Sequence, residues 1–185
     1  MRPFISLIVF SVFFLGCNRG VSQKDLNALD SLYSVSIKAD SLLGVINKIE
    51  INEITLKIEH TVGQFHAHYA DTIPWETAKL ISKYHRLKKA FVKHIENNDY
   101  ITKELNYTKT QLQNLKKDLE NNVLKPEKFR LYYNIEAETL LQLDSLAKHE
   151  FAFASNKLQM YKEWDPAIND LLNKLKLDSV SSTIE

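Results

Sequence analysis

The sequence predicts an all-α protein, built as an elongated antiparallel helical bundle with coiled-coil-like packing and up-down topology. Glycine and proline are scarce, with four of each in 185 residues. The chain therefore has few places to turn, and its elements must be long. Apolar side chains also recur at three- and four-residue steps over most of the chain, which is the spacing of one helix face. We expect four long helices followed by a short C-terminal one.

The charge balance argues against a nucleic-acid partner. The chain carries 24 basic and 23 acidic residues. Without residues 1–16, which contain Arg2 and no acid, it would be formally neutral. A protein that binds nucleic acid needs a net basic face. The length that remains fits one domain.

Residues 1–17 contain the most specific motif of the sequence. Arg2 precedes an unbroken apolar run over residues 4–15, followed by Gly16 and Cys17, the only cysteine. This order is typical of a secretory signal peptide, and a run of about 12 residues is too short for a helix that crosses a bilayer. The ending Phe-Leu-Gly-Cys resembles the lipobox of bacterial lipoproteins. The alternatives are an ordinary signal peptide or a buried hydrophobic helix with an incidental cysteine.

The resemblance to bacterial lipoproteins implies a domain organisation and a location. Cys17 would become the first mature residue and carry the lipid, which would also remove an unpaired thiol from an oxidising compartment. Asn18 after the cysteine implies the cell envelope, at the outer membrane facing the periplasm. We expect a signal peptide over 1–16, an anchored spacer over 17–24, one helical domain over 25–178 and a flexible tail over 179–185.

The longest predicted helix covers residues 25–70. Apolar side chains recur on one face from Leu29 to Ile49, and after a shift in phase the same spacing continues from Ile54 to Tyr69. Such a shift changes the supercoil locally without ending the helix.

Two alternatives for this segment remain open. Apolar residues alternate over 49–58 as they would in a strand, but no turn residue stands nearby to make a hairpin partner. Breaks near Gly44 or Asn52 would fold the long helix back into a more globular bundle.

A second helix is predicted over residues 74–96 and a third over 99–123. Pro74 suits the first turn of a helix, where its missing N–H costs nothing. Residues 97–99, Asn-Asn-Asp, are expected to break the chain, with Asp99 as the cap of the third helix.

A fourth helix is predicted from Pro126 to about residue 162. The Trp-Asp-Pro sequence at 164–166 is expected to kink or restart the chain before a short last helix over 168–175. Short connections make neighbouring helices antiparallel. The lengths then predict a stalk of two helices near the lipid and a head of four helices far from it.

Two histidines are candidate ligands of a haem or metal ion. In the antiparallel arrangement His94 and His149 fall at similar heights, and each continues an apolar helix face. Opposed imidazoles inside a bundle can ligate such a group. Half-buried histidines with one hydrogen bond are the commoner outcome, so we expect no cofactor and keep a carrier of haem, metal or a small apolar molecule as the alternative function.

Three aromatic residues are candidates for a docking patch. Tyr69, Trp75 and Tyr132 map to the same end of the bundle in this topology. They would either cap the core where helix ends leave gaps or form an exposed surface for a partner.

No motif of catalysis is visible. The sequence has no nucleophile elbow and no glycine-rich phosphate loop, and a lipidated Cys17 could not act as a nucleophile. We therefore expect a non-catalytic protein-binding or scaffolding module, held at the membrane through Cys17, with another envelope protein as its partner.

Overall fold

The computed structural model describes residues 22–68 and 73–181. They form the helices α1 (Gln23–Gly44), α2 (Lys48–His68), α3 (Trp75–Glu120) and α4 (Pro126–Ser181). Within these ranges there is no strand, so the all-α prediction is confirmed, and residues 49–58 belong to α2.

Several predicted features lie outside the described residues. These are the signal peptide over 1–16, the lipidated Cys17, Tyr69, and residues 182–185 of the tail. The predicted domain boundaries remain predictions. Helix α1 begins inside the predicted spacer, and α4 continues into the predicted tail.

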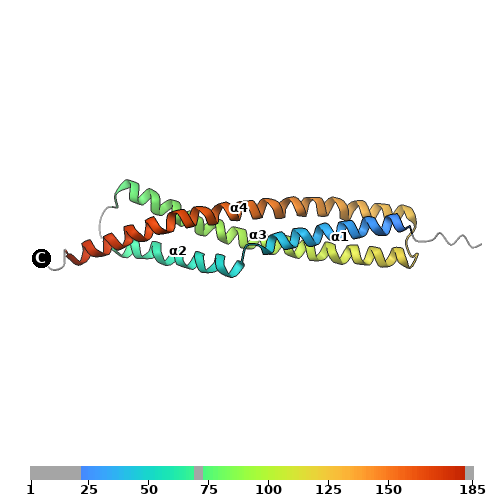
Figure 1. Ribbon diagram of the computed structural model, residues 1–185, viewed down its shortest axis with the longest axis horizontal. Coiled ribbons are helices and arrows are strands. Elements are labelled where there is room, and N and C mark those ends of the chain that lie inside the picture. The colour runs from blue at the N-terminus through green and yellow to red at the C-terminus, as the bar shows by residue number, and fades with distance from the viewer. Residues whose placement is uncertain (1–21, 69–72, 182–185) are drawn as a thin grey trace, which may run out of the picture.

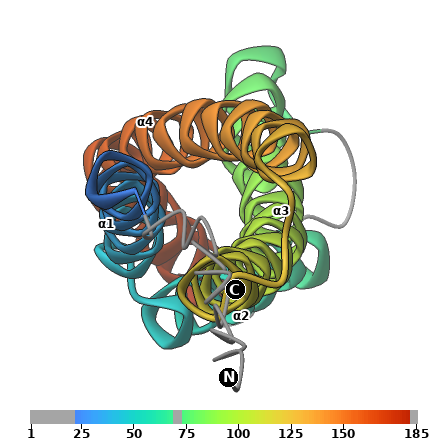
Figure 2. The same cartoon turned by 90° about the vertical axis from the view of Figure 1, so that its right-hand side faces the viewer.

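Over most of its length the bundle has three helices in cross-section, and α4 continues past the others at its C-terminal end. Helices α1 and α2 follow one another on one side, do not pack against each other, and each packs against both α3 and α4. Figure 1 shows α3 and α4 running past both of them, and Figure 2 shows the view along the axis. The predicted stalk of two helices with a head of four is therefore wrong, as is the count of four long helices and a short fifth.

The main cause of this difference is that α3 continues through residues 97–99. Its core-facing positions keep a seven-residue step across them, from the buried Phe91 through Asn98 to the buried Leu105. Asn98 is only partly buried, and its amide donates to the Leu43 carbonyl at the end of α1, at 3.2 Å. Asp99 pairs with Lys48 at the start of α2, at 2.6 Å. These polar side chains therefore serve the neighbouring helix ends and do not end their own helix.

Helix α4 likewise continues through Pro166. Beyond the proline the core-facing residues Ile168 and Leu172 are 0% and 4% exposed. Packing on both sides of the proline therefore holds α4 as one helix, and the predicted restart over 168–175 is wrong.

The predicted long helix over 25–70 is interrupted where the alternative placed a break, next to Gly44. The break covers residues 45–47, and the Asn47 carboxamide oxygen accepts from the Ile49 N–H at 2.8 Å, as an N-cap does. The chain does not fold back here, because α2 continues along the same side of α3 and α4.

Local capping and turn geometry explain three further helix ends. The Ser22 hydroxyl accepts from the Asp25 N–H at the start of α1. After α3, Asn122 adopts a left-handed φ of 54°, and the Val123 N–H donates to the Asp118 carbonyl at 2.9 Å. This pattern is a Schellman turn. As predicted, Pro126 then occupies the first turn of its helix.

The buried side chains form two separate hydrophobic clusters. The first lies between α2, the N-terminal half of α3 and the C-terminal half of α4, and includes Ile58, Phe65 and Phe91. The second lies between α1, the C-terminal half of α3 and the N-terminal half of α4, and includes Leu29 and Ile101. The bundle is thus two packed halves in series. None of the helices within residues 22–68 and 73–181 combines the length and apolar character that crossing a membrane takes.

Candidate functional site

A buried polar layer lies between the two hydrophobic clusters. His94 on α3 and Glu150 on α4 are 3% and 6% exposed. The His94 Nδ1 atom lies 3.3 Å from Glu150 Oε2, and Asn97 donates its amide N–H to Glu150 Oε1 at 2.8 Å. The layer satisfies each of these buried groups with a partner, as buried polar atoms require.

The predicted pairing of His94 with His149 does not form, because the facing residue is Glu150. His94 turns into the bundle, but the side chain of His149 is 73% exposed. Its Nδ1 lies 3.8 Å from Glu150 Oε1, on the outer side of that carboxylate. Within residues 22–68 and 73–181 no three His, Cys, Asp or Glu side chains are placed to hold a metal ion. The geometry gives the carrier hypothesis no pair of opposed imidazoles.

Sequence reasoning missed Glu150, although its spacing marks it. Leu140, Leu143, Ala147 and Ala154 are all buried on α4. Steps of three and four residues through these positions include Glu150 and leave out His149. The core face could therefore be recognised only through Ala147 and Ala154. Alanine is small and gives a weak hydrophobic signal, so this face was missed.

A second polar cluster joins α2, α3 and α4. The Tyr84 hydroxyl donates to Asp165 Oδ1 at 2.6 Å, and Lys57 Nζ donates to Asp165 Oδ2 at 2.7 Å. The ring of Tyr161 stacks on that of Tyr84 with centroids 6.2 Å apart, and Lys57 Nζ lies 5.8 Å from the centre of the Tyr161 ring. Three helices therefore meet on one carboxylate.

The electrostatics of this cluster favour structure over acid–base chemistry. Burial and the hydrogen bond to Asp165 raise the pKa of Tyr84 far above its ordinary value. Burial would also raise the pKa of Asp165, but hydrogen bonds from Lys57 and Tyr84 together outweigh it and lower that pKa. The hydrogen bond to Asp165 raises the pKa of Lys57. At neutral pH each group thus keeps its usual protonation state, and none is poised to transfer a proton.

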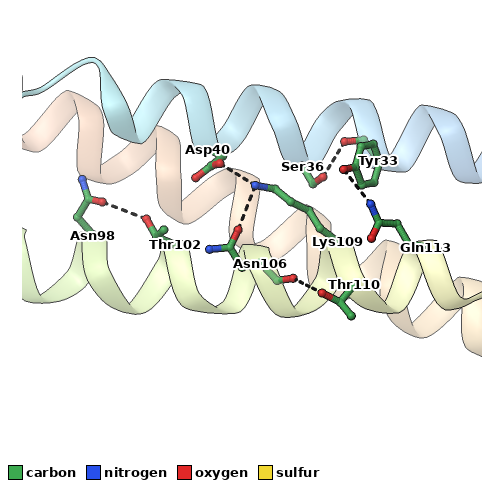
Figure 3. Close-up of polar contacts among 9 residues, drawn as sticks. All are labelled: Tyr33, Ser36, Asp40, Asn98, Thr102, Asn106, Lys109, Thr110 and Gln113. Carbon is green, nitrogen blue, oxygen red and sulfur yellow. Dashed lines mark hydrogen bonds and ion pairs between the residues drawn. The ribbon is translucent and has the colours of Figure 1, made fainter.

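Helices α1 and α3 are joined by polar contacts along their exposed seam, shown in Figure 3. Lys109 Nζ donates to Asp40 Oδ2 at 2.6 Å and to Asn106 Oδ1 at 3.3 Å. One turn along, the Gln113 amide donates to the Tyr33 hydroxyl at 3.1 Å. These contacts fix the register of α1 on α3.

The structure separates the predicted docking residues. Trp75 is the first residue of α3 and is 75% exposed. Tyr132 is 43% exposed and lines a hollow with Leu115 and Asp118, near the other end of α3. Because a helix rises 1.5 Å per residue, Trp75 and Leu115 lie roughly 60 Å apart. Trp75 and Tyr132 therefore cannot belong to one patch, and Tyr69 lies outside the described residues.

Helix α4 instead carries a second apolar face beside its core face, which we call the outer stripe. Its members recur at steps of four, seven and eleven residues, so they share one side of the helix. Leu131, Ile135 and Leu146 are 56%, 50% and 44% exposed. The later members are half-buried, and Met160 and Trp164 among them also pack against the first hydrophobic cluster. The outer stripe consists of Leu131, Ile135, Leu146, Phe153, Met160 and Trp164.

Two hollows lie between α3 and α4, and one of them includes members of the outer stripe. The basic hollow, about 370 Å³, is lined by the cations Lys83, Arg86 and Lys157 and includes Met160 and Trp164. The acidic hollow, about 180 Å³, is lined by Asp118, Glu136 and Tyr132, with no cation. Burial raises the pKa of Glu136. The α3–α4 face is thus opposite in charge at its two hollows.

No protein-family model, no curated protein and no solved structure matches this chain.

Proposed function

We propose that the chain is a non-catalytic, lipid-anchored protein of the cell envelope. Its rod-shaped bundle binds another protein through the outer stripe of α4. The observation that supports this is the stripe itself. Leu131, Ile135 and Leu146 are large apolar side chains that remain exposed, although two hydrophobic clusters already fill the bundle. Large apolar side chains that stay exposed along one side of a helix are typical of an interaction surface.

A binding role fits the polar groups better than catalysis does. In the described part of the chain, no buried side-chain nitrogen or oxygen lacks a hydrogen-bond partner. The His94–Glu150 layer and the Tyr84–Asp165–Lys57 cluster use their polar atoms on each other. Such networks make a bundle rigid, which is what a scaffold needs.

The anchor in this proposal rests on the resemblance of residues 1–17 to a lipoprotein signal. Since α1 begins at Gln23, a lipid on Cys17 would hold the α1 end of the rod close to the membrane. The outer stripe begins at that same end, with Leu131 near the start of α4. A partner in or near the same membrane would then reach the stripe.

Photo-crosslinking in the native envelope tests the proposal. A photoreactive residue at Ile135 or Leu146 is expected to capture a protein partner. The control is the same residue at Leu141, which is also on α4 and is 70% exposed but lies off the stripe. Cys17→Ala should lose both the lipid mass and the crosslink. Equal capture at Leu141, or no fatty-acid mass on the native protein, would contradict the proposal.

A further inference from the structure

We propose that a second copy of this chain occupies the α3–α4 face, with the two α4 helices antiparallel and their outer stripes in contact. This inference rests on the proposed binding role of the stripe and names its partner. It is carried by the opposite charges of the two hollows and by their spacing along α4.

The spacing of the hollows has a two-fold relation. Residue 148 lies midway between Tyr132 and Trp164, and also midway between Glu136 and Met160. Tyr132 and Glu136 line the acidic hollow, while Met160 and Trp164 line the basic one. Two antiparallel α4 helices that meet at residue 148 therefore bring each acidic hollow against the basic hollow of the other copy.

The charges then pair at both ends of the contact. Lys83, Arg86 and Lys157 of one copy face Asp118 and Glu136 of the other, and the symmetry repeats this pairing once. A closed two-fold interface of this kind uses the same patch on both subunits. A parallel arrangement would set the three cations of one copy against those of the other, so the charges select the antiparallel one.

Two apolar pairs of the stripe match to within half a residue of that centre. Leu131 and Ile135 near one end of α4 come to lie against Trp164 and Met160 of the second copy. At the centre, Leu146 meets the exposed His149. A stripe from residue 131 to 164 spans roughly 50 Å at 1.5 Å per residue and about 10 Å across. Two such faces bury on the order of 1,000 Å², at the lower bound for a specific interface.

Charge reversal at the two hollows tests the pairing. The full chain is kept in a mild detergent, and light scattering corrected for the detergent mass measures the mass of the protein complex. One variant carries Lys83→Glu with Arg86→Glu, and the other carries Asp118→Lys with Glu136→Lys. Each variant alone places like charges together, so its dissociation constant is expected to rise by at least about tenfold. An equimolar mixture restores opposite charges at both ends and should form a heterodimer as tight as the wild-type dimer.

Two controls separate a loss of pairing from a loss of folding. Helical circular dichroism and melting temperature should be similar in both variants and in wild type. Lys24→Glu with Lys38→Glu makes the same charge change as the variant at Lys83 and Arg86, but at exposed sites on α1. It should leave the dimer intact.

A wild-type chain that stays monomeric at tens of micromolar would overturn the inference, as would a mixture of the two variants that does not associate. If photo-crosslinking at Ile135 still captures a different envelope protein, the proposed function stands and the face belongs to that partner.

Discussion

Asp165 is the residue on which three helices converge. It accepts hydrogen bonds from Tyr84 on α3 and Lys57 on α2 while its own backbone belongs to α4. Its carboxylate is more stable in the folded chain than in the unfolded one, because the pKa is lowered from 3.8. A carboxylate whose pKa is lower in the folded chain stabilises the fold at any pH above its pKa in the unfolded chain. That contribution disappears as the pH falls through its pKa in the folded chain.

Asp165→Asn tests this contribution through its dependence on pH. At pH 7 the variant should lose about 1–3 kcal/mol of unfolding free energy, since Lys57 loses its charged acceptor. The deficit should shrink as the pH drops below 3.8, because the carboxylate of the unfolded wild-type chain is protonated there, and it should disappear below the lowered pKa of the folded chain. Urea unfolding at pH 7 and at pH 3 measures both values.

The matched control is Asp170→Asn, an exposed aspartate one turn further along α4. Its effect should stay within about 0.5 kcal/mol. A deficit of Asp165→Asn that does not change between the two pH values would contradict the assignment of its stability to the carboxylate charge.

Helix α4 is the element that most of the molecule depends on. It contacts all three other helices, carries both the core face and the outer stripe, and contains one proline in its interior. Pro166 cannot donate to the carbonyl four residues earlier, and its ring crowds that carbonyl. The helix persists there because buried residues on either side, such as Tyr161 and Ile168, anchor it to the first cluster.

Pro166→Ala is expected to raise the unfolding free energy by about 1–3 kcal/mol, because it restores a helix hydrogen bond. Pro166 is exposed, so no packing is lost. Pro126→Ala is the control, since the first turn of a helix has no use for that N–H. Thermal and chemical unfolding followed by circular dichroism measure the change. A loss of stability in Pro166→Ala would show that the proline serves the fold.

The whole molecule consists of two hydrophobic cores in series, separated by the His94–Glu150 layer. α3 and α4 are common to both halves, whereas α1 belongs to one and α2 to the other. Within residues 22–68 and 73–181, the buried apolar side chains of the two halves belong to separate clusters. We therefore expect changes in one core to have no direct packing route to the other.

Matched deletions in the two cores test this separation. Ile58→Val in the first cluster and Ile101→Val in the second each remove one methyl group from a site that is 0% and 2% exposed, respectively. Each should cost about 0.5–1.5 kcal/mol. The double variant should show the sum to within about 0.5 kcal/mol, as independent sites do. Guanidinium unfolding of the four proteins completes the cycle, and a larger coupling would mean that the cores act as one.

The sequence alone determined what depends on neighbours in the chain. Helix formation follows from apolar steps of three and four residues, and Pro126 opens α4 where a proline costs least. The scarcity of glycine and proline correctly implied long elements. Each of these effects acts within one or two turns of a helix, so its cause is written in adjacent residues.

Tertiary structure decided the features that need a partner from elsewhere in the chain. Asn98 is a breaker by local propensity, yet it remains helical because it bonds the end of α1. α4 has two apolar faces, and only packing against the other helices selects the one with Glu150 as the core, leaving His149, Leu131, Ile135 and Leu146 exposed. The physical reason is that burial is a property of pairs of elements, and periodicity specifies a face without specifying what covers it.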